Sequence, residues 1–219
     1  SSCERMRVSG DAGGAAGALF GVSTPFQVAD WGALSFKPKL AFRLFGGTHR
    51  GAFPKLRATL TMPKGGANIA RAAVTLPPSE FLEQGHIGTV CTRVQYAADE
   101  CPQRSVYGSA IARTPLFDGP LRGPVYLRSS DNLLPDMVAK LKGPDSKPVQ
   151  IDLVGRIDSF KRRIRNTFHI VPDAPVESFT LQLLGGKKSL LVNSTDICKG
   201  THRATARFTG HNRERVVLR

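Results

Sequence analysis

Apolar and polar residues alternate along most of the chain with the period of a half-buried β-strand. The clearest run covers residues 33–45, in which the apolar set on one face is Leu34, Phe36, Leu40, Phe42 and Leu44. Lys39, Ala41 and Arg43 fall on the opposite face, as a period of two requires. Pro38 interrupts this run and predicts a bulge or a sheet edge.

Further segments carry the same strand signature, and turn residues such as Asp118-Gly119-Pro120 separate them. They are residues 5–8, 56–62, 69–76, 105–113, 123–128, 136–142, 149–157, 164–171, 178–184 and 203–209. Helical signals are confined to residues 79–98, where Ser79 is a candidate N-cap and residues 92–98 suit a second turn. The pattern predicts an all-β protein, an antiparallel β-sandwich or two abutting sandwiches, with this one short helical segment.

The chain divides by composition into three parts. Residues 1–21 combine a first strand with a Gly/Ala-rich arm, whose residues 9–18 have too little side-chain bulk to pack and predict a loop. Residues 22–104 form a first β half and residues 105–219 a second. The alternative is that the two halves make one continuous domain.

Composition and charge indicate a folded, basic protein and limit the kinds of molecule it is expected to bind. With 219 residues, 41% of them hydrophobic, the chain is long enough to bury a substantial core. Thirty-one Lys and Arg against 17 Asp and Glu give a net charge of +14, which favours association with an anionic polymer or simply keeps the protein in solution. No apolar stretch is long enough for a transmembrane segment.

Cysteines point to an oxidising compartment. Cys91 and Cys101 close a short loop at the end of the first half, and a disulfide there contributes about 3 kcal/mol in the chain-entropy model. Cys3 and Cys198 complete the set of four, which allows three connectivities.

Two basic turns are candidate polyanion-binding sites. Lys161, Arg162, Arg163 and Arg165 lie at a predicted hairpin tip, and Lys187 and Lys188 lie at another turn. No aromatic side chain interleaves with these charges as a base-stacking platform would require. A solvated Arg-rich loop is the alternative interpretation.

Catalytic and metal-binding motifs do not emerge from the sequence. The histidines are scattered, without His-Glu-x-x-His or Cys-x-x-Cys spacing. Residues 185–189 imitate a phosphate loop, but Lys188 stands where Ser or Thr belongs. Asp152 and Asp158 lie about 20 Å apart on an extended strand, too far for a glycosidase pair. We therefore predict no catalytic residue, metal ligand, cofactor or small-molecule substrate, and no enzymatic activity.

The order of several phrases resembles a module of large exported β-rich bacterial proteins of unknown function, over roughly residues 22–212. The phrases lie at residues 23–28, 33–38, 67–69, 74–77, 91–102, 106–110, 121–126, 134–136, 151–155, 167–168, 171–176 and 191–193, followed by Cys198. Relatives carry a cysteine where this chain has Trp31, so the resemblance implies that Cys3 pairs with Cys198, beside Cys91 with Cys101. Relatives also have a small turn in place of residues 160–165.

The resemblance implies a surface or matrix role. We expect a non-enzymatic, extracellular structural or adhesive module of the bacterial cell surface that self-associates, as in a repeating filament, or binds other surface proteins. The alternative function is a basic module that binds an anionic polymer, either cell-wall glycan or extracellular nucleic acid.

Overall fold

The computed structural model describes residues 6–13, 19–26, 33–143 and 148–219. Antiparallel strands make up nearly all of the regular structure, which confirms the prediction of an all-β fold. Within the described residues, eleven strands form one sheet in the order β15-β14-β5-β11-β10-β9-β8-β7-β12-β4-β3. The two smaller sheets each pair two strands, β1 with β2 and β6 with β13.

Most strands of the large sheet lie within a few residues of the predicted segments, but residues 33–38 of the predicted run 33–45 are not part of a strand. The strands of the large sheet are β3 (Lys39–Phe45), β4 (Lys55–Thr61), β5 (Ile69–Thr75), β7 (Val106–Arg113), β8 (Leu121–Arg128), β9 (Asp136–Lys142), β10 (Gln150–Phe160), β11 (Arg163–Phe168), β12 (Ser178–Leu183), β14 (Thr205–Gly210) and β15 (Arg215–Leu218). The smaller sheets hold β1 (Met6–Gly13), β2 (Leu19–Phe26), β6 (Glu80–Leu82) and β13 (Leu191–Asn193). The helical elements are α1 (Arg93–Ala97) and the 3-10 turns η2 (Gln84–His86), η3 (Gln103–Ser105) and η4 (Gly186–Lys188).

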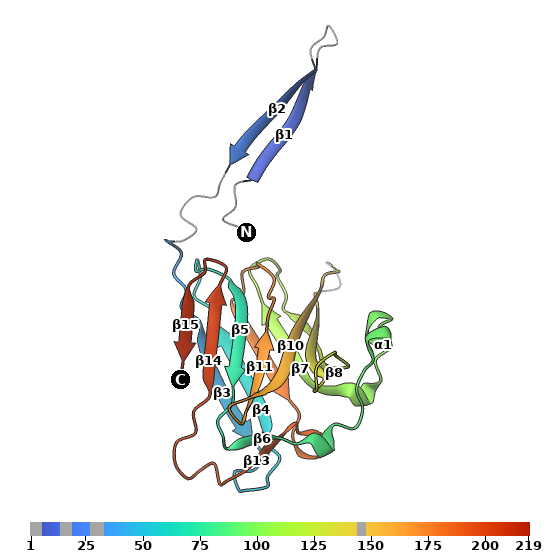
Figure 1. Cartoon of the computed structure of the whole chain (residues 1–219), viewed down its shortest axis with the longest axis vertical. Helices are drawn as coiled ribbons and strands as arrows, with labels where there is room; N and C mark the ends of the chain where they lie inside the picture. The colour runs from blue at the N-terminus through green and yellow to red at the C-terminus, as the bar shows by residue number, and fades with distance from the viewer. Residues whose placement is uncertain (1–5, 14–18, 27–32, 144–147) are drawn as a thin grey trace.

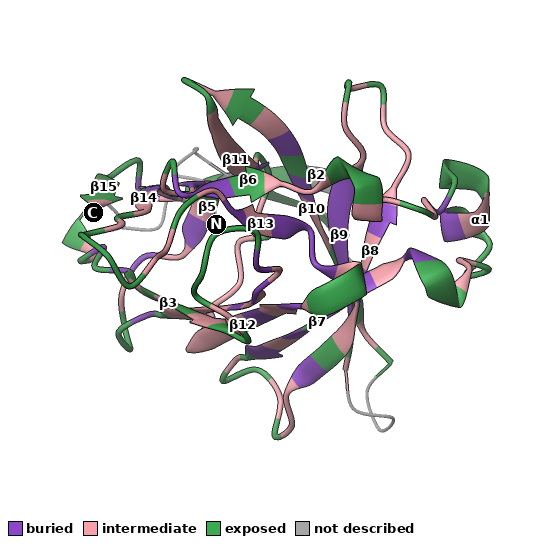
Figure 2. Cartoon of the chain, turned by 90° about the horizontal axis from the view of Figure 1, so that it is seen from below, coloured by how far each residue is buried: buried purple, intermediate pink, exposed green. Residues whose placement is uncertain are grey.

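The large sheet folds over on itself, so that its two halves face each other as two layers (Figures 1 and 2). β8 and β9 form the bend, where the chain carries Gly123 and Pro124. A Cβ on Gly123 would overlap the backbone carbonyl oxygen of Lys140 in β9, so only glycine permits this approach. Apolar side chains at alternate positions of both layers point toward each other and form the core.

The two edges of the folded sheet, β3 and β15, are bridged by residues 33–38. The backbone oxygen of Ser35 accepts from the Ala67 amide at 3.0 Å, and that of Leu34 accepts from Asn212 Nδ2 at 2.8 Å. Phe36 is 3% exposed and packs with Phe208 in a second apolar cluster. This segment therefore joins one end of the sheet to the other, and we call it the seam.

β6 and β13 lie across the end of the molecule seen in Figure 2, between the two layers. The helix predicted from Ser79 is wrong, because Glu80–Leu82 forms β6 and pairs antiparallel with Leu191–Asn193. Flanking bonds from Glu83 N to Leu190 O and from Ser194 N to Ser79 O extend this pairing. Long-range pairing has overridden a local N-cap signature, which lacked the length to form a helix.

The predicted disulfide between Cys91 and Cys101 is present and closes a loop that contains α1. Thr92 caps α1 in a capping box with Gln95, which confirms the predicted turn of helix. At the end of the loop, Asp99 accepts from Lys140 Nζ at 2.8 Å and from Lys142 Nζ at 3.0 Å. These two lysines hold the pKa of Asp99 below its ordinary value. The loop is thereby fixed to β9.

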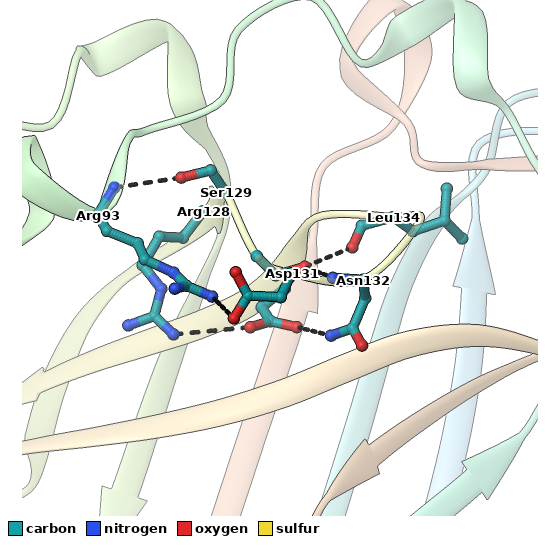
Figure 3. A network of polar contacts seen from close by, with 8 residues as sticks. Arg93, Arg128, Ser129, Asp131, Asn132 and Leu134 are labelled. Carbon is teal, nitrogen blue, oxygen red and sulfur yellow. Dashed lines mark hydrogen bonds and ion pairs between the residues drawn. The ribbon is translucent and has the colours of Figure 1, made fainter.

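A polar network attaches the other side of the same loop to the β8–β9 connection (Figure 3). Arg93 Nη2 lies 2.6 Å from Asp131 Oδ2, and the Arg93 amide donates to Ser129 Oγ. Closer to the core, Arg128 Nη2 lies 3.6 Å from Asp136 Oδ2. The other carboxylate oxygen of Asp136, Oδ1, accepts from Asn132 Nδ2. α1 is thus held to the body by side-chain contacts as well as by the disulfide.

The hairpin of β1 and β2 stands apart from the folded sheet and pairs only with itself among the described strands (Figure 1). Val8 of β1 and Val22 of β2 have 62% and 54% of their surface exposed. Residues 9–13, predicted as a loop, continue strand β1, and residues 14–18 lie outside the described part. The loop prediction is wrong for residues 9–13 because pairing with β2 supplies their backbone partners. No described helix has the length and apolarity needed to cross a membrane.

Candidate ligand-binding cavity

The core between the two layers is hollow. A cavity of about 420 Å³ lies among inward-facing side chains of both layers. Its walls are largely aliphatic and aromatic and include Leu40, Phe42, Leu60, Val74, Leu141, Leu153, Ile164, Phe168, Phe179 and Leu181. Strand alternation places every second residue on this face, and those residues are mostly apolar. The residues that the sequence predicts as core therefore also line the cavity.

The cavity opens between three connections at one end of the molecule. These connections are residues 62–68 after β4, residues 114–117 after β7 and residues 171–177 after β11. Pro63, Lys64 and Leu116 line the cavity and are themselves exposed, so this end is in contact with solvent. Lys64 Nζ lies 4.0 Å from Glu177 Oε1 across the opening. The charged residues among the described lining are these two, and both are at the opening.

The opposite end is closed by the pair β6 and β13. Leu190 and Leu191 are 2% and 3% exposed and contribute to the cavity wall together with Leu82. The cavity therefore resembles a cup, with an apolar floor and an open rim.

A single polar side chain interrupts the inward face of the described strands of the large sheet. Asn166 lies on β11 between Val74 of β5 and Ile157 of β10, and it lines the cavity. Its Oδ1 is buried without a hydrogen-bond partner, and its Nδ2 donates only to the thioether sulfur of Met137, at 3.4 Å. Sulfur is a weak acceptor, so the amide is poorly satisfied.

A second buried polar group lies beside the floor. Glu80 on β6 is 2% exposed, and neither carboxyl oxygen has a hydrogen-bond partner at normal geometry. Asn193, its register partner on β13, is 1% exposed and also leaves Oδ1 unpaired. Burial raises the pKa of Glu80 to about 7, although the adjacent Ser79 hydroxyl lowers it to a smaller extent.

The structure divides the predicted basic cluster of residues 161–165. Lys161 and Arg162 are exposed at the turn between β10 and β11, with φ values of 51° and 60°. Arg165 is held by Asp158 through two bonds of 2.8 and 2.6 Å and stacks over Phe160, while Arg163 donates to the backbone oxygens of Leu76 and Arg203. Arg165 holds the pKa of Asp158 below its ordinary value. Arg163 and Arg165 therefore have hydrogen-bond partners, and Lys161 Nζ lies 5.6 Å from the centre of the Phe160 ring.

The other predicted basic turn forms η4. Lys187 is exposed, whereas Lys188 Nζ donates to the backbone oxygens of Arg104 and Val106. Both basic turns lie at the closed end of the molecule, since β10 and β12 run in the same direction. The structure thus leaves Lys161, Arg162 and Lys187 available to solvent.

The remaining predicted site residues are the cysteines. Cys198 is exposed and carries a free thiol in the structure, while Cys3 lies outside the described residues, so their pairing stays a prediction. Among the described residues, no three His, Cys, Asp or Glu side chains are grouped closely enough to hold a metal ion.

The fold and the cavity define an antiparallel all-β protein with an open apolar cavity between two layers of one sheet. Comparisons with protein-family models, with curated proteins and with solved structures found no match to this chain.

Sequence reasoning missed the cavity and Asn166. One signal for Asn166 was present, because it occupies an apolar phase between Ile164 and Phe168. The hollow itself has no local signal, since a filled core and a hollow one require the same alternation of residues.

Proposed function

We propose that this protein binds a small apolar molecule in the cavity between its two sheet layers. The observation that supports this proposal is a cavity of about 420 Å³ with an almost wholly apolar lining and one open end. Ligand sites in proteins commonly measure about 300–1,000 Å³ and are lined mainly by hydrophobic side chains.

Packing energetics favour an occupant. Protein interiors are normally close-packed, and side chains that line an empty space lose dispersion contacts that a filled core would provide. An apolar molecule regains these contacts and removes its own surface from water, at about 25 cal/mol per Å² buried. The cavity is already formed between hydrogen-bonded strands, so binding requires little ordering of the backbone.

The disulfide between Cys91 and Cys101 indicates an oxidising environment. Together with the resemblance to exported modules, it supports an extracellular or cell-surface location as part of this proposal. A structural or adhesive role remains a prediction, which ligand binding by the same module does not exclude.

Filling the cavity tests the proposal. Ala58 lines the cavity on β4 between Phe42 and Leu181, so Ala58→Phe places a ring in the hollow. We expect the wild-type protein to enhance the fluorescence of N-phenyl-1-naphthylamine with saturable binding, and Ala58→Phe to weaken that binding at least tenfold. Melting temperature measures whether the variant is folded, and we expect it to be unchanged or raised, because filling a cavity adds contacts.

Thr59→Phe is the matched control. Thr59 is next along β4, does not line the cavity and has its register partners Ala41 and Thr180 on the outer face. This variant adds the same ring outside and should bind the probe like the wild type. Absence of saturable binding in the wild-type protein, or equal loss in both variants, would contradict the proposal.

A further inference from the structure

Asn166 is the polar side chain that the strands of the large sheet contribute to the cavity wall, and its identity points to the class of ligand. We infer that Asn166 is the polar anchor of the cavity, and that the natural ligand is a neutral apolar molecule carrying a hydroxyl group that donates a hydrogen bond to Asn166 Oδ1. This inference rests on the proposed function and adds a chemical class to it.

Asn166 occupies a position where alternation calls for an apolar residue. It belongs to a row of paired inward-facing residues that runs across four strands: Ala206, Val74, Asn166 and Ile157. Its inward neighbours along β11, Ile164 and Phe168, are apolar and line the cavity with it. An amide in this setting gives up its hydration and must obtain a partner from elsewhere.

The folded protein provides a partner for the Nδ2 group of Asn166 but none for its Oδ1 atom. Asn166 Nδ2 reaches Met137 Sδ at 3.4 Å, and Oδ1 has no donor. Leaving a buried acceptor unpaired costs stability, whereas a leucine of similar volume would carry no such penalty. The arrangement is therefore unfavourable for stability alone, which is typical of a group that serves a ligand.

The sheet also makes room for this amide. Gly155 on β10 lies beside Asn166, and a Cβ at Gly155 would overlap the Asn166 carboxamide. Oδ1 is the amide atom nearest to the Cβ position of Gly155 and is itself buried, so ligand binding requires the amide to rotate about its soft terminal torsion until Oδ1 meets the ligand. Glycine at position 155 and asparagine at position 166 act as a pair, one providing the space and the other the polar atom.

The required donor is a neutral group. Among the described lining residues the charged ones, Lys64 and Glu177, lie at the opening, and the inner wall has no charge that would pair with a carboxylate or an ammonium. Desolvating an ion there would be prohibitive, whereas a hydroxyl needs a single acceptor. Asn166 Oδ1 is that acceptor.

The test compares two molecules that differ by one hydroxyl, 1-decanol and decane, as competitors for bound N-phenyl-1-naphthylamine. The measured quantity is the ratio of the affinity for 1-decanol to that for decane. We expect this ratio to be about tenfold higher in the wild type than in Asn166→Leu, which corresponds to about 1.4 kcal/mol. Asn166→Ala, which only truncates the side chain, should lower the ratio similarly and covers the case in which the leucine variant does not fold.

Phe168→Leu is the control, because it alters the cavity wall on the same strand without touching a polar atom. Its ratio should match that of the wild type within about twofold, since both competitors meet the same change. If decane and 1-decanol both displace the probe but the ratio is the same in all variants, the anchor is overturned while cavity binding stands. If neither molecule displaces the probe from the wild type, the proposed function itself falls.

Discussion

Glu80 combines deep burial, an ionisable carboxyl and a lack of fixed partners. Its register partner on β13 is Asn193, whose Nδ2 donates to the backbone oxygens of Gly47 and His49. Asn193 Oδ1 is an unpaired acceptor on the same side of the β6–β13 pair as the Glu80 carboxyl. Two acceptors do not satisfy each other unless one carries a proton. Burial favours the neutral form of Glu80 by removing the charged carboxylate from water, and a protonated carboxyl is also a donor as well as an acceptor.

Stability should therefore depend on pH through this residue. The pKa of Glu80 is about 7 in the folded protein against an ordinary value of 4.5, so its contribution is complete below pH 4.5 and is lost as pH rises through 7. We expect the free energy of unfolding of the wild type, relative to Glu80→Gln, to fall by about 3 kcal/mol between pH 4.5 and pH 8. Urea denaturation at several pH values measures this difference.

Glu100→Gln serves as the control, because Glu100 is an exposed carboxyl in the disulfide loop. Its denaturation profile should follow that of the wild type at every pH. A wild-type profile parallel to that of Glu80→Gln would show that Glu80 does not titrate in this range.

At the residue scale, the sequence predicts which side chains point inward but not what happens to those that are polar. Asn166 lies in a predicted strand and Glu80 in the predicted helical segment, and their unpaired atoms arise only when strands distant in sequence come together. The paired state of Arg163 and Arg165 was equally hidden, because Asp158, Leu76 and Arg203 reach them only through the folded hairpin and its neighbours.

Among the elements, the turn between β10 and β11 is the one whose sequence fits its backbone least well. Lys161 and Arg162 both have positive φ, a conformation that two-residue hairpins normally assign to Asn-Gly. Positive φ is sterically unfavourable for side chains other than Gly and Asn, so Lys161 and Arg162 lower the stability of the turn. Both cations are exposed there. The exposure of these two cations supports the alternative function, in which the protein binds an anionic polymer.

The double variant Lys161→Asn/Arg162→Gly separates charge from backbone strain. We expect it to raise the free energy of unfolding by about 1 kcal/mol, because both residues then suit positive φ. If the turn binds polyanions, the slope of the logarithm of affinity for duplex DNA against the logarithm of salt concentration should fall by about 1.8, for two lost phosphate contacts. Denaturation and salt titrations measure the two effects separately.

Arg213→Gly is the comparison variant, since Arg213 also has positive φ, at 70°, in the turn between β14 and β15. It should gain stability in the same way without changing the slope. An unchanged slope in the double variant would remove the β10–β11 turn as a polyanion site.

Most strands with strong alternation were predicted near their true bounds, although the run at residues 33–45 is a strand only from Lys39 onward. The strand β2 and the short strands were not predicted. β6 and β13 have three residues each and exist because they pair with each other, and β15 follows the last predicted strand as its hairpin partner. Such elements carry too few residues for a periodic signal, so their existence depends on tertiary contacts.

For the molecule as a whole, the hairpin of β1 and β2 is the element suited to self-association. An isolated two-stranded hairpin is marginally stable in water, and this one exposes its valines and keeps both outer edges unpaired within the described structure. Another copy presents β3 and β15, the outermost strands of its large sheet. These features support the expectation that copies of the chain associate.

Removing residues 1–32 tests this expectation, because the folded sheet begins beyond them. We expect residues 33–219 to keep the circular dichroism spectrum and melting transition of the body and to sediment as a monomer. The complete chain should form larger species as its concentration rises. Identical sedimentation of both proteins across the concentration range would contradict a role for the hairpin.

The order of strands in the large sheet could not be read from the sequence. β5, from the first predicted half, lies between β11 and β14 of the second, and β12 lies between β7 and β4. Local patterning determines that strands form and which face is apolar, but many orders would bury the same faces. The order is fixed by packing over the whole sheet, including the bend at Gly123.

The seam has a consequence for the timing of folding during synthesis. Residues 34–36 meet Asn212 and Phe208 across nearly the full length of the chain, so the two sheet edges join only after β14 and β15 have left the ribosome. Until then β5 lacks one of its two neighbouring strands, β14, and the apolar faces of both layers remain open to water. A nascent or truncated chain therefore exposes the apolar faces that line the cavity in the folded protein. We expect such a chain to aggregate unless a chaperone covers these faces.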